Sequence, residues 1–187
     1  MKILEIQKVD LASFCYLNSE RYPFLLESVN HNDFNRYSIL FAFPGESIVL
    51  KSFSDFDFLN ELKNQFKPNN LNSDLPFVGG WFVYLSYELI GQIESSLSSE
   101  VYRSNLPIAY AVKIPSAIII DHQLDKTYLI DQDGNEDRIN SILSDIKLTK
   151  PIPKKAIEGK LSEENQEKFT DGVKACLDYI VSGDVFQ

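Results

Sequence analysis

The chain has few of the features that mark specialised classes of protein. It carries two cysteines in 187 residues, Cys15 and Cys176, which lie far apart and lack the short spacing of a zinc site or a redox pair. We expect both to be buried thiols of a reducing cytosol. No apolar run reaches the ~20 residues that span a bilayer, and no basic segment followed by an apolar one opens the chain. The sequence therefore predicts a cytoplasmic protein without a membrane partner.

Positive charge is also scarce. The chain has 18 lysines and arginines against 27 aspartates and glutamates, which gives a formal charge of -9 at pH 7. Binding to nucleic acid requires clustered basic side chains, so we exclude nucleic acid as a partner. With 44% hydrophobic residues, the composition is that of a globular protein with one good core or two small ones.

The sequence shows no convincing catalytic or metal-binding set. His31 and His122 stand beside no serine or cysteine elbow and at no metal-ligand spacing. Asp121 and His122 are adjacent, so on a strand they would point to opposite faces and could not converge on one substrate. Gly79-Gly80 lacks the following helix that a phosphate site requires. We therefore predict no catalytic residue, no metal ligand and no cofactor within these 187 residues.

Residues 77–87 form the most apolar stretch and predict a central strand that is buried on both faces. Gly79 and Gly80 within it predict a change of layer, because glycine in a strand marks a bend or a close backbone approach. Pro115 divides two apolar runs and predicts a bulged or edge segment, since proline cannot donate to a sheet.

Two antiparallel hairpins are expected. The first joins 36–43 to 47–50 across Pro44-Gly45, and the second brings 126–130 back across Leu124-Asp125. Apolar residues at three- and four-residue spacing predict helices at 10–14, 57–66, 135–146 and 162–182. This order of elements favours an α+β fold, in which antiparallel β-sheets pack as a sandwich with flanking helices.

The segment from Lys150 to Lys155 is rich in proline and lysine and predicts a linker. We expect an N-terminal α+β domain at 1–149, a linker at 150–160 and the start of a second domain at 161–187. Residues 185–187 open an apolar strand that has no partner in the sequence, which is typical of a truncated chain.

Four segments resemble, in the same order, motifs of the chorismate-utilising enzymes, specifically the large subunits of aminodeoxychorismate synthase and anthranilate synthase. They are Leu25-Leu26-Glu27-Ser28, then Arg36-Tyr37-Ser38, then Leu75-Pro76-Phe77 with Gly79-Gly80-Trp81 and Tyr84 through Leu89, and finally Tyr179-Ile180-Val181-Ser182-Gly183-Asp184-Val185-Phe186-Gln187. The third segment departs from the family pattern twice, because Val83 precedes Tyr84 where a glycine is usual and Ser86-Tyr87-Glu88 stands where Gly-Tyr-Asp is usual. The resemblance covers the chain from about residue 23 to its end.

The resemblance implies the N-terminal part of aminodeoxychorismate synthase component I, the para-aminobenzoate synthase large subunit. That enzyme aminates chorismate to 4-amino-4-deoxychorismate in folate biosynthesis, with ammonia from a glutamine amidotransferase subunit. We favour it because Leu106-Pro107, residues 111–117 and Asp121-His122 look more like its sequences. The alternatives are anthranilate synthase component I, of tryptophan biosynthesis, and a non-catalytic module that binds tryptophan or the amidotransferase.

In the family, chorismate and its Mg²⁺ are held by residues downstream of the motif at 179–187. The resemblance therefore implies an enzyme whose active site lies outside these 187 residues, so we expect the chain by itself to be inactive.

The resemblance also implies a tryptophan-binding pocket in this half. Leu26, Glu27 and Ser28 match the family's contacting tripeptide, with Ser28 expected to meet the charged backbone groups of the ligand and Leu26 to line the indole slot. A return segment matches more loosely, at Phe34, Asn35, Arg36 and Tyr37. Asn35 replaces the commoner serine. Without the resemblance, Ser28 is interpreted as a turn serine and Arg36 as a surface charge.

Overall fold

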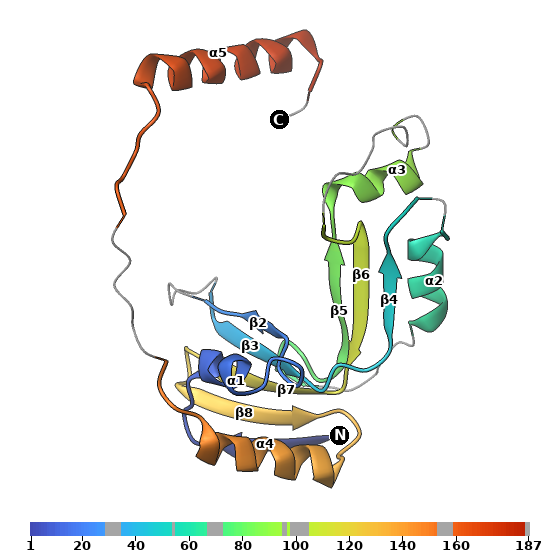
Figure 1. Ribbon diagram of the computed structural model, residues 1–187, viewed down its shortest axis with the longest axis vertical. Coiled ribbons are helices and arrows are strands. Elements are labelled where there is room, and N and C mark those ends of the chain that lie inside the picture. Colours follow the sequence, from blue (N-terminus) through green and yellow to red (C-terminus); the bar gives the residue numbers. More distant parts are fainter. Residues whose placement is uncertain are drawn as a thin grey trace. The chain divides into compact units, whose positions relative to one another are not determined.

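The computed structural model describes residues 1–28, 35–53, 55–66, 73–94, 97, 105–152 and 159–185. The chain forms two compact units, residues 1–152 and residues 153–187 (Figure 1). The first unit contains two antiparallel sheets with helices packed on them. The described part of the second unit contains one helix, α5 (Gln166–Ser182). No described helix is long and apolar enough to cross a membrane.

The larger sheet has five strands in the order β1-β8-β7-β3-β2, and every described pair is antiparallel. Its strands are β1 (Lys2–Ile6), β8 (Lys126–Asp131), β7 (Ser116–Asp121), β3 (Tyr37–Ala42) and β2 (Phe24–Leu26). All six residues of β7 are buried. Strand β7 is therefore the most enclosed strand of the first unit.

The smaller sheet has three strands in the order β4-β6-β5, which are β4 (Ser47–Leu50), β6 (Ala109–Ile114) and β5 (Gly80–Leu85). Strand β6 continues into β7 through Pro115 alone, so the chain changes sheets at this residue. The predicted bulged or edge segment is wrong, because β6 and β7 are interior strands of their sheets. Proline suits the corner between them, since it has no N–H to donate to either ladder.

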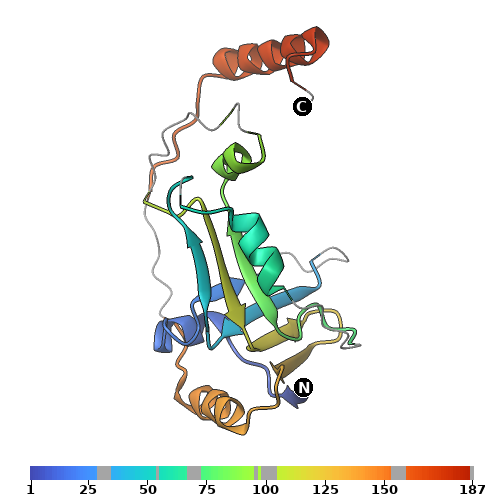
Figure 2. The same cartoon turned by 90° about the vertical axis from the view of Figure 1, so that its right-hand side faces the viewer.

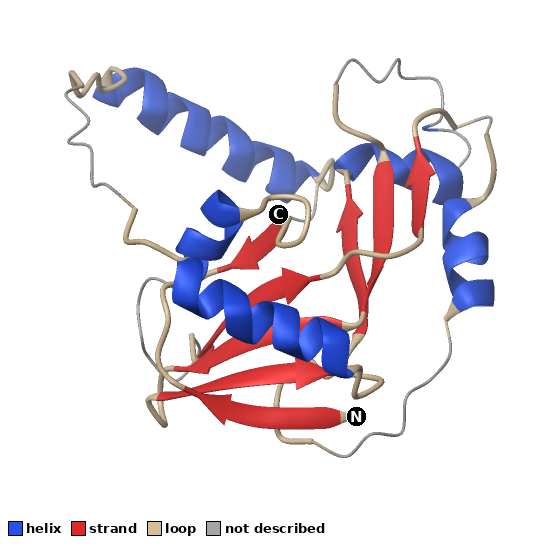
Figure 3. Cartoon of the chain, turned by 60° about the horizontal axis from the view of Figure 1, so that its bottom comes forward, coloured by secondary structure: helices blue, strands red, loops and turns tan. Residues whose placement is uncertain are grey.

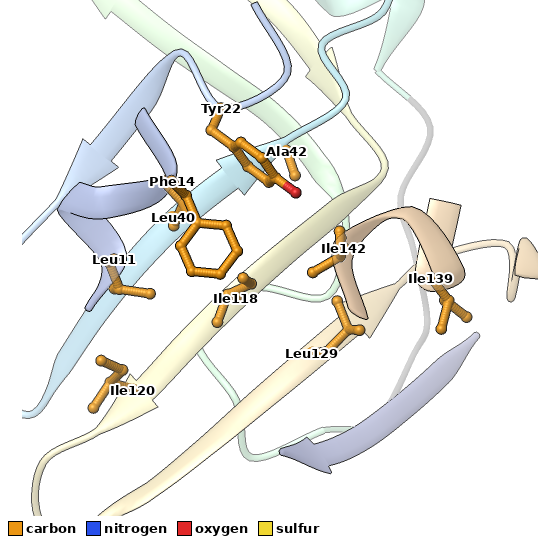
Figure 4. Close-up of a cluster of buried hydrophobic side chains, with 10 residues drawn as sticks. All are labelled: Leu11, Phe14, Tyr22, Leu40, Ala42, Ile118, Ile120, Leu129, Ile139 and Ile142. Carbon is orange, nitrogen blue, oxygen red and sulfur yellow. The ribbon is translucent and has the colours of Figure 1, made fainter. Parts of the chain in front are cut away.

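Two helices, α1 (Leu11–Leu17) and α4 (Glu136–Leu148), cover one face of the five-stranded sheet (Figure 3). Both begin at side-chain caps, since the Asp10 carboxylate accepts from the Ala12 N–H and the Asn135 amide oxygen accepts from the Arg138 N–H. Their apolar faces and the strands enclose the main core, formed by Leu11, Phe14, Tyr22, Leu40, Ala42, Ile118, Ile120, Leu129, Ile139 and Ile142 (Figure 4).

Helix α2 (Phe58–Gln65) packs on the outer face of the three-stranded sheet, where its Phe58 is fully buried (Figure 2). The two sheets meet in an aromatic cluster. Phe24 of β2 stacks on Phe82 of β5 with ring centroids 4.0 Å apart, and Phe41 of β3 meets Phe82 edge-on at 5.3 Å. The α+β class is therefore confirmed, whereas the sandwich arrangement is not.

The first predicted hairpin is wrong. Strand β3 pairs with β2 and β7, whereas β4 pairs with β6, so Pro44-Gly45 carries the chain between sheets. Both strands find longer or more apolar partners elsewhere, and local sequence does not contain that information. The second hairpin, β7 with β8, is confirmed.

The predicted central strand at 77–87 is also wrong. Strand β5 begins at Gly80 and lies at the edge of the three-stranded sheet, and the chain then turns into the short helices η1 (Tyr87–Leu89) and α3 (Ile90–Ile93). The preceding Leu75, Phe77 and Val78 pack instead on the five-stranded sheet. Gly79 and Gly80, with φ of 120° and 147°, therefore stand where the chain passes from one layer to the other, as the glycine pair predicts.

Helix α5 starts later than predicted. Asn165 caps it by accepting from the Glu167 N–H, whereas the predicted helix begins at residue 162. Its end is as predicted, because Gly183 adopts the left-handed conformation with φ of 80°.

Candidate ligand-binding site

The site expected from the resemblance lies where β2 ends and β3 begins. The Ser28 hydroxyl donates to the Tyr37 carbonyl oxygen at 2.8 Å, and the Ser28 N–H donates to Ser38 Oγ at 3.0 Å. These two bonds clamp the end of β2 to the start of β3. Because the single hydroxyl proton of Ser28 is already donated, its oxygen can only accept a hydrogen bond from a ligand, as an ammonium group would require.

Leu26 and Glu27 of the predicted tripeptide differ in their surroundings. Leu26 pairs with Ile39, so it shares a sheet face with Ile39 and Tyr37 and leaves 53% of its surface exposed. Glu27 acts on the helix side of the sheet, where burial raises the pKa of Cys15 and the Glu27 carboxylate adds to that rise. An apolar surface and a carboxylate thus flank Ser28.

Arg36 is bound to a buried carboxylate. Its Nε lies 3.0 and 3.1 Å from the two oxygens of Asp121, and its Nη2 donates at 2.6 Å. The Arg36 hydrogen bonds hold the pKa of Asp121 below its usual value against the opposing effect of burial, and the N–H groups of Leu124 and Gln123 contribute. The guanidinium also lies 4.8 Å from the ring centre of Tyr37. Arg36 therefore orients Tyr37 and is largely neutralised by Asp121.

A second polar contact lies on the opposite side of β3. Ser38 Oγ is 2.7 Å from His122 Nε2, and the His122 N–H donates to the Arg36 carbonyl oxygen at 2.9 Å. Asp121 and His122 thus engage different partners, Arg36 and Ser38, and do not form an acid–base pair.

A hollow of about 290 Å³ lies beside Arg36 and Tyr37, and its walls include Asp121, Tyr128 and Leu75. Leu26, Glu27 and Ser28 do not line it. The structure therefore brings the predicted residues close together along two paired strand ends, but it divides them between this hollow and the exposed surface at Leu26.

The structure gives less information on the two remaining predicted residues, Asn35 and Phe34. Asn35 is exposed at the start of the return segment. Phe34 and His31 lie outside the described residues.

Sequence reasoning missed Asp121, Ser38 and His122 as partners of the predicted site. Their role follows from the β3–β7 register, in which Tyr37 faces Asp121. The sequence contains one signal for this register, because polar residues end the apolar runs of both β3 and β7. The incorrect first hairpin, however, paired β3 with residues 47–50.

Among the described residues, no group of three or more His, Cys, Asp or Glu side chains could hold a metal ion. The described residues thus offer no ligand set for the Mg²⁺ that the resemblance implies.

Comparison with known proteins extends these observations. A protein of Synechocystis sp. described as anthranilate synthase component I-like is 27% identical over 175 residues, which cover 86% of this chain and 34% of that protein. Anthranilate synthase component 1 of Acinetobacter calcoaceticus is 29% identical over an alignment of 213 residues, gaps included, that covers 95% of this chain and 42% of the relative. The chain thus spans between about a third and two fifths of the length of these relatives.

A solved structure has the same fold. Anthranilate synthase component I from Streptococcus pneumoniae TIGR4 matches with a TM-score of 0.54 and 22% identity, over 83% of this chain and 40% of that one. The sequence pattern of the chorismate binding enzymes matches residues 17–187, which is most of the chain. The chain therefore belongs to the chorismate binding enzyme family.

Proposed function

We propose that this chain is the amino-terminal part of a large subunit of the anthranilate synthase type, which converts chorismate with ammonia from a glutamine amidotransferase partner. The match of residues 17–187 to the chorismate binding enzymes carries the proposal. The relatives' names favour anthranilate synthase over our sequence-based first choice, aminodeoxychorismate synthase. In this proposal, the 187 residues form a structural domain with a ligand pocket. Chorismate and Mg²⁺ are bound by residues beyond the motif at 179–187.

Aminodeoxychorismate synthase is the second candidate. It is supported by the segment from Leu106 to His122, which forms β6, Pro115 and β7 and resembles that enzyme's sequences more closely. A non-catalytic module that binds tryptophan or the amidotransferase is a third reading.

Product analysis distinguishes the three functions. The full-length gene product is incubated with chorismate, Mg²⁺ and either ammonium or glutamine plus the amidotransferase. We expect anthranilate, which is detected by its fluorescence. Aminodeoxychorismate, detected as para-aminobenzoate after treatment with its lyase, would favour the second candidate. Unchanged chorismate would overturn both enzymatic readings.

Tryptophan is the proposed ligand of the strand ends at Leu26–Ser28 and Asn35–Tyr37. Leu26 offers an apolar surface for the indole ring and Ser28 Oγ can accept from the ammonium group, whereas Glu27 lies on the helix side of the sheet. Such a combination of apolar and polar groups suits an amphipathic amino acid.

Calorimetry with tryptophan tests this pocket. We expect weak binding to the 187-residue chain and about tenfold to hundredfold weaker binding to Ser28→Ala, since a hydrogen bond to a charged group is lost. Ser28→Thr keeps the hydroxyl and should restore binding, whereas Ser47→Ala, at an exposed serine of β4, serves as the neutral control. Equal affinities for the Ser28→Ala variant and the wild type would remove the assignment.

A further inference from the structure

A second hollow in the first unit is separate from the strand ends proposed for tryptophan. It has a volume of about 820 Å³ and lies between the end of α2 and the segment that leads into β5. Small-molecule sites commonly enclose roughly 300–1,000 Å³. The segment that resembles the family motif, residues 75–81, forms one wall, and neither the proposed chemistry nor the proposed tryptophan pocket uses it.

The two aromatic side chains that line the hollow, Phe77 and Trp81, are both packed against other residues of the first unit. Phe77 meets Phe41 of β3 edge-on, with ring centres 5.0 Å apart and planes at 83°. Trp81 is half-buried against the cluster under α2. Since both aromatic side chains are fixed by packing, a ligand ring would meet a surface that needs little reordering.

Two opposite charges stand side by side at the rim of the hollow. The Lys113 N–H donates to the Glu46 carbonyl oxygen at 3.0 Å, so the two residues are neighbours on adjacent segments. Within the described residues, neither the Lys113 ammonium nor the Glu46 carboxylate has a hydrogen-bond or ion-pair partner. The rim therefore presents one unpaired cation, Lys113, and one unpaired anion, Glu46, beside an aromatic wall, and a second carboxylate in the lining, Glu61, accepts a hydrogen bond from Gln65.

We propose that this hollow binds a small zwitterion with an aromatic side chain, that is, an aromatic amino acid. Its carboxylate would meet Lys113, its ammonium would meet Glu46, and its ring would lie on Phe77 and Trp81. A zwitterion can form ion pairs with both rim charges at once, whereas an amine or a carboxylate alone leaves one of them unpaired. This site is independent of the proposed chorismate chemistry and of the tryptophan pocket.

Trp81 allows the site to be observed directly, because it is the only tryptophan of the chain. The probe is L-phenylalanine, which does not emit when tryptophan is excited selectively. We expect a saturable change in Trp81 emission. Phenylacetate, which lacks the ammonium group, and phenethylamine, which lacks the carboxylate, should each bind about tenfold more weakly or worse.

Variants at the rim complete the test. Lys113→Met and Glu46→Gln should each weaken L-phenylalanine binding by about tenfold or more, and since both side chains are exposed we expect the variants to fold. Lys51→Met and Glu20→Gln, at exposed residues that do not line the hollow, should bind as the wild type does. Ser28→Ala should also leave this signal unchanged, which separates the site from the tryptophan pocket. An absent or unsaturable emission change, or equal binding by the rim variants, would overturn the proposal.

Discussion

Buried carboxylates of the first unit are each matched by an arginine. The ion pairs are Arg21–Asp145, Arg36–Asp121 and Arg138–Asp131. The three aspartates expose 8% of their surface or less. Charges removed from water need such partners, because an unpaired one carries the full cost of its desolvation. The arginines therefore decide whether these carboxylates can stay buried.

The substitution Arg36→Met should lower the free energy of unfolding by about 2–3 kcal/mol, since it leaves the buried Asp121 carboxylate without its charged partner and with only the N–H groups of Gln123 and Leu124 as donors. Lys8→Met is the matched control, because its partner Asp125 is exposed and such exposed pairs contribute little to stability. Urea denaturation measures both. Equal midpoints for the two variants would show that Asp121 is stable without Arg36.

Asp131 predicts a dependence of stability on pH. Burial alone would raise its pKa, but hydrogen bonds from Arg138, Ser116 and the Asn135 N–H lower it to about 2 from 3.8. A carboxyl whose pKa is lower when folded stabilises the protein above its unfolded pKa, and it loses that contribution as the pH falls through its folded pKa. We therefore expect about 2 kcal/mol to be lost between pH 5 and pH 2.

The matched variant for this test is Asp131→Asn. Its stability deficit against the wild type should be largest near pH 7 and should shrink as the pH falls toward 2, because the wild-type carboxyl then becomes neutral as well. Urea denaturation over this pH range measures the deficit. A deficit that stays constant would assign the pH dependence to other groups.

At the scale of elements, the sequence predicts what is decided locally. The helices at Leu11–Leu17, Phe58–Gln65 and Glu136–Leu148 were expected from apolar spacing. The pairing of β3 with β7 joins residues about 80 positions apart, a choice made by the packing of both faces. The edge position of β5 was missed for the same reason.

The candidate site divides in a similar way. Ser28 and Arg36 could be identified from the resemblance, because they belong to short segments. Asp121 could not, since its contact with Arg36 depends on the long-range register. The hollow beside Trp81 also could not be predicted from the sequence, because its walls come from α2, β6 and the segment before β5, which are far apart along the chain.

Helix α5 offers a test with two glycines of opposite effect. Gly172 lies inside the helix, and within its own unit a Cβ there would meet no atom within 4 Å. Gly172→Ala should therefore stabilise α5 by about 0.5–1 kcal/mol. Gly183→Ala should destabilise it by about 1 kcal/mol, because Gly183 ends the helix with φ of 80°.

Amide hydrogen exchange of α5 in the 187-residue chain measures both changes. Protection factors should rise about twofold to fivefold in Gly172→Ala and fall by a similar factor in Gly183→Ala. Changes of the same sign in both variants would contradict this account of how the helix is formed and ended.

Considered as a whole, the first unit contains its own core. All four clusters of buried apolar side chains described by the structure draw on residues between Leu4 and Ile146. A domain of about 150 residues can bury enough surface to fold by itself. We therefore predict that residues 1–152 unfold in one cooperative transition, with a midpoint within a few degrees of that of the same unit in the 187-residue chain.

Thermal unfolding followed by circular dichroism and calorimetry tests this prediction on both chain lengths. Ile142→Ala, which removes a fully buried side chain under α4, should cost about 2–5 kcal/mol in each length, because the same core is truncated in both. If residues 1–152 instead showed exposed hydrophobic surface and no cooperative transition, the core would require residues after Ile152. An Ile142→Ala effect found in only one of the two lengths would likewise show that the core is not complete within the first unit.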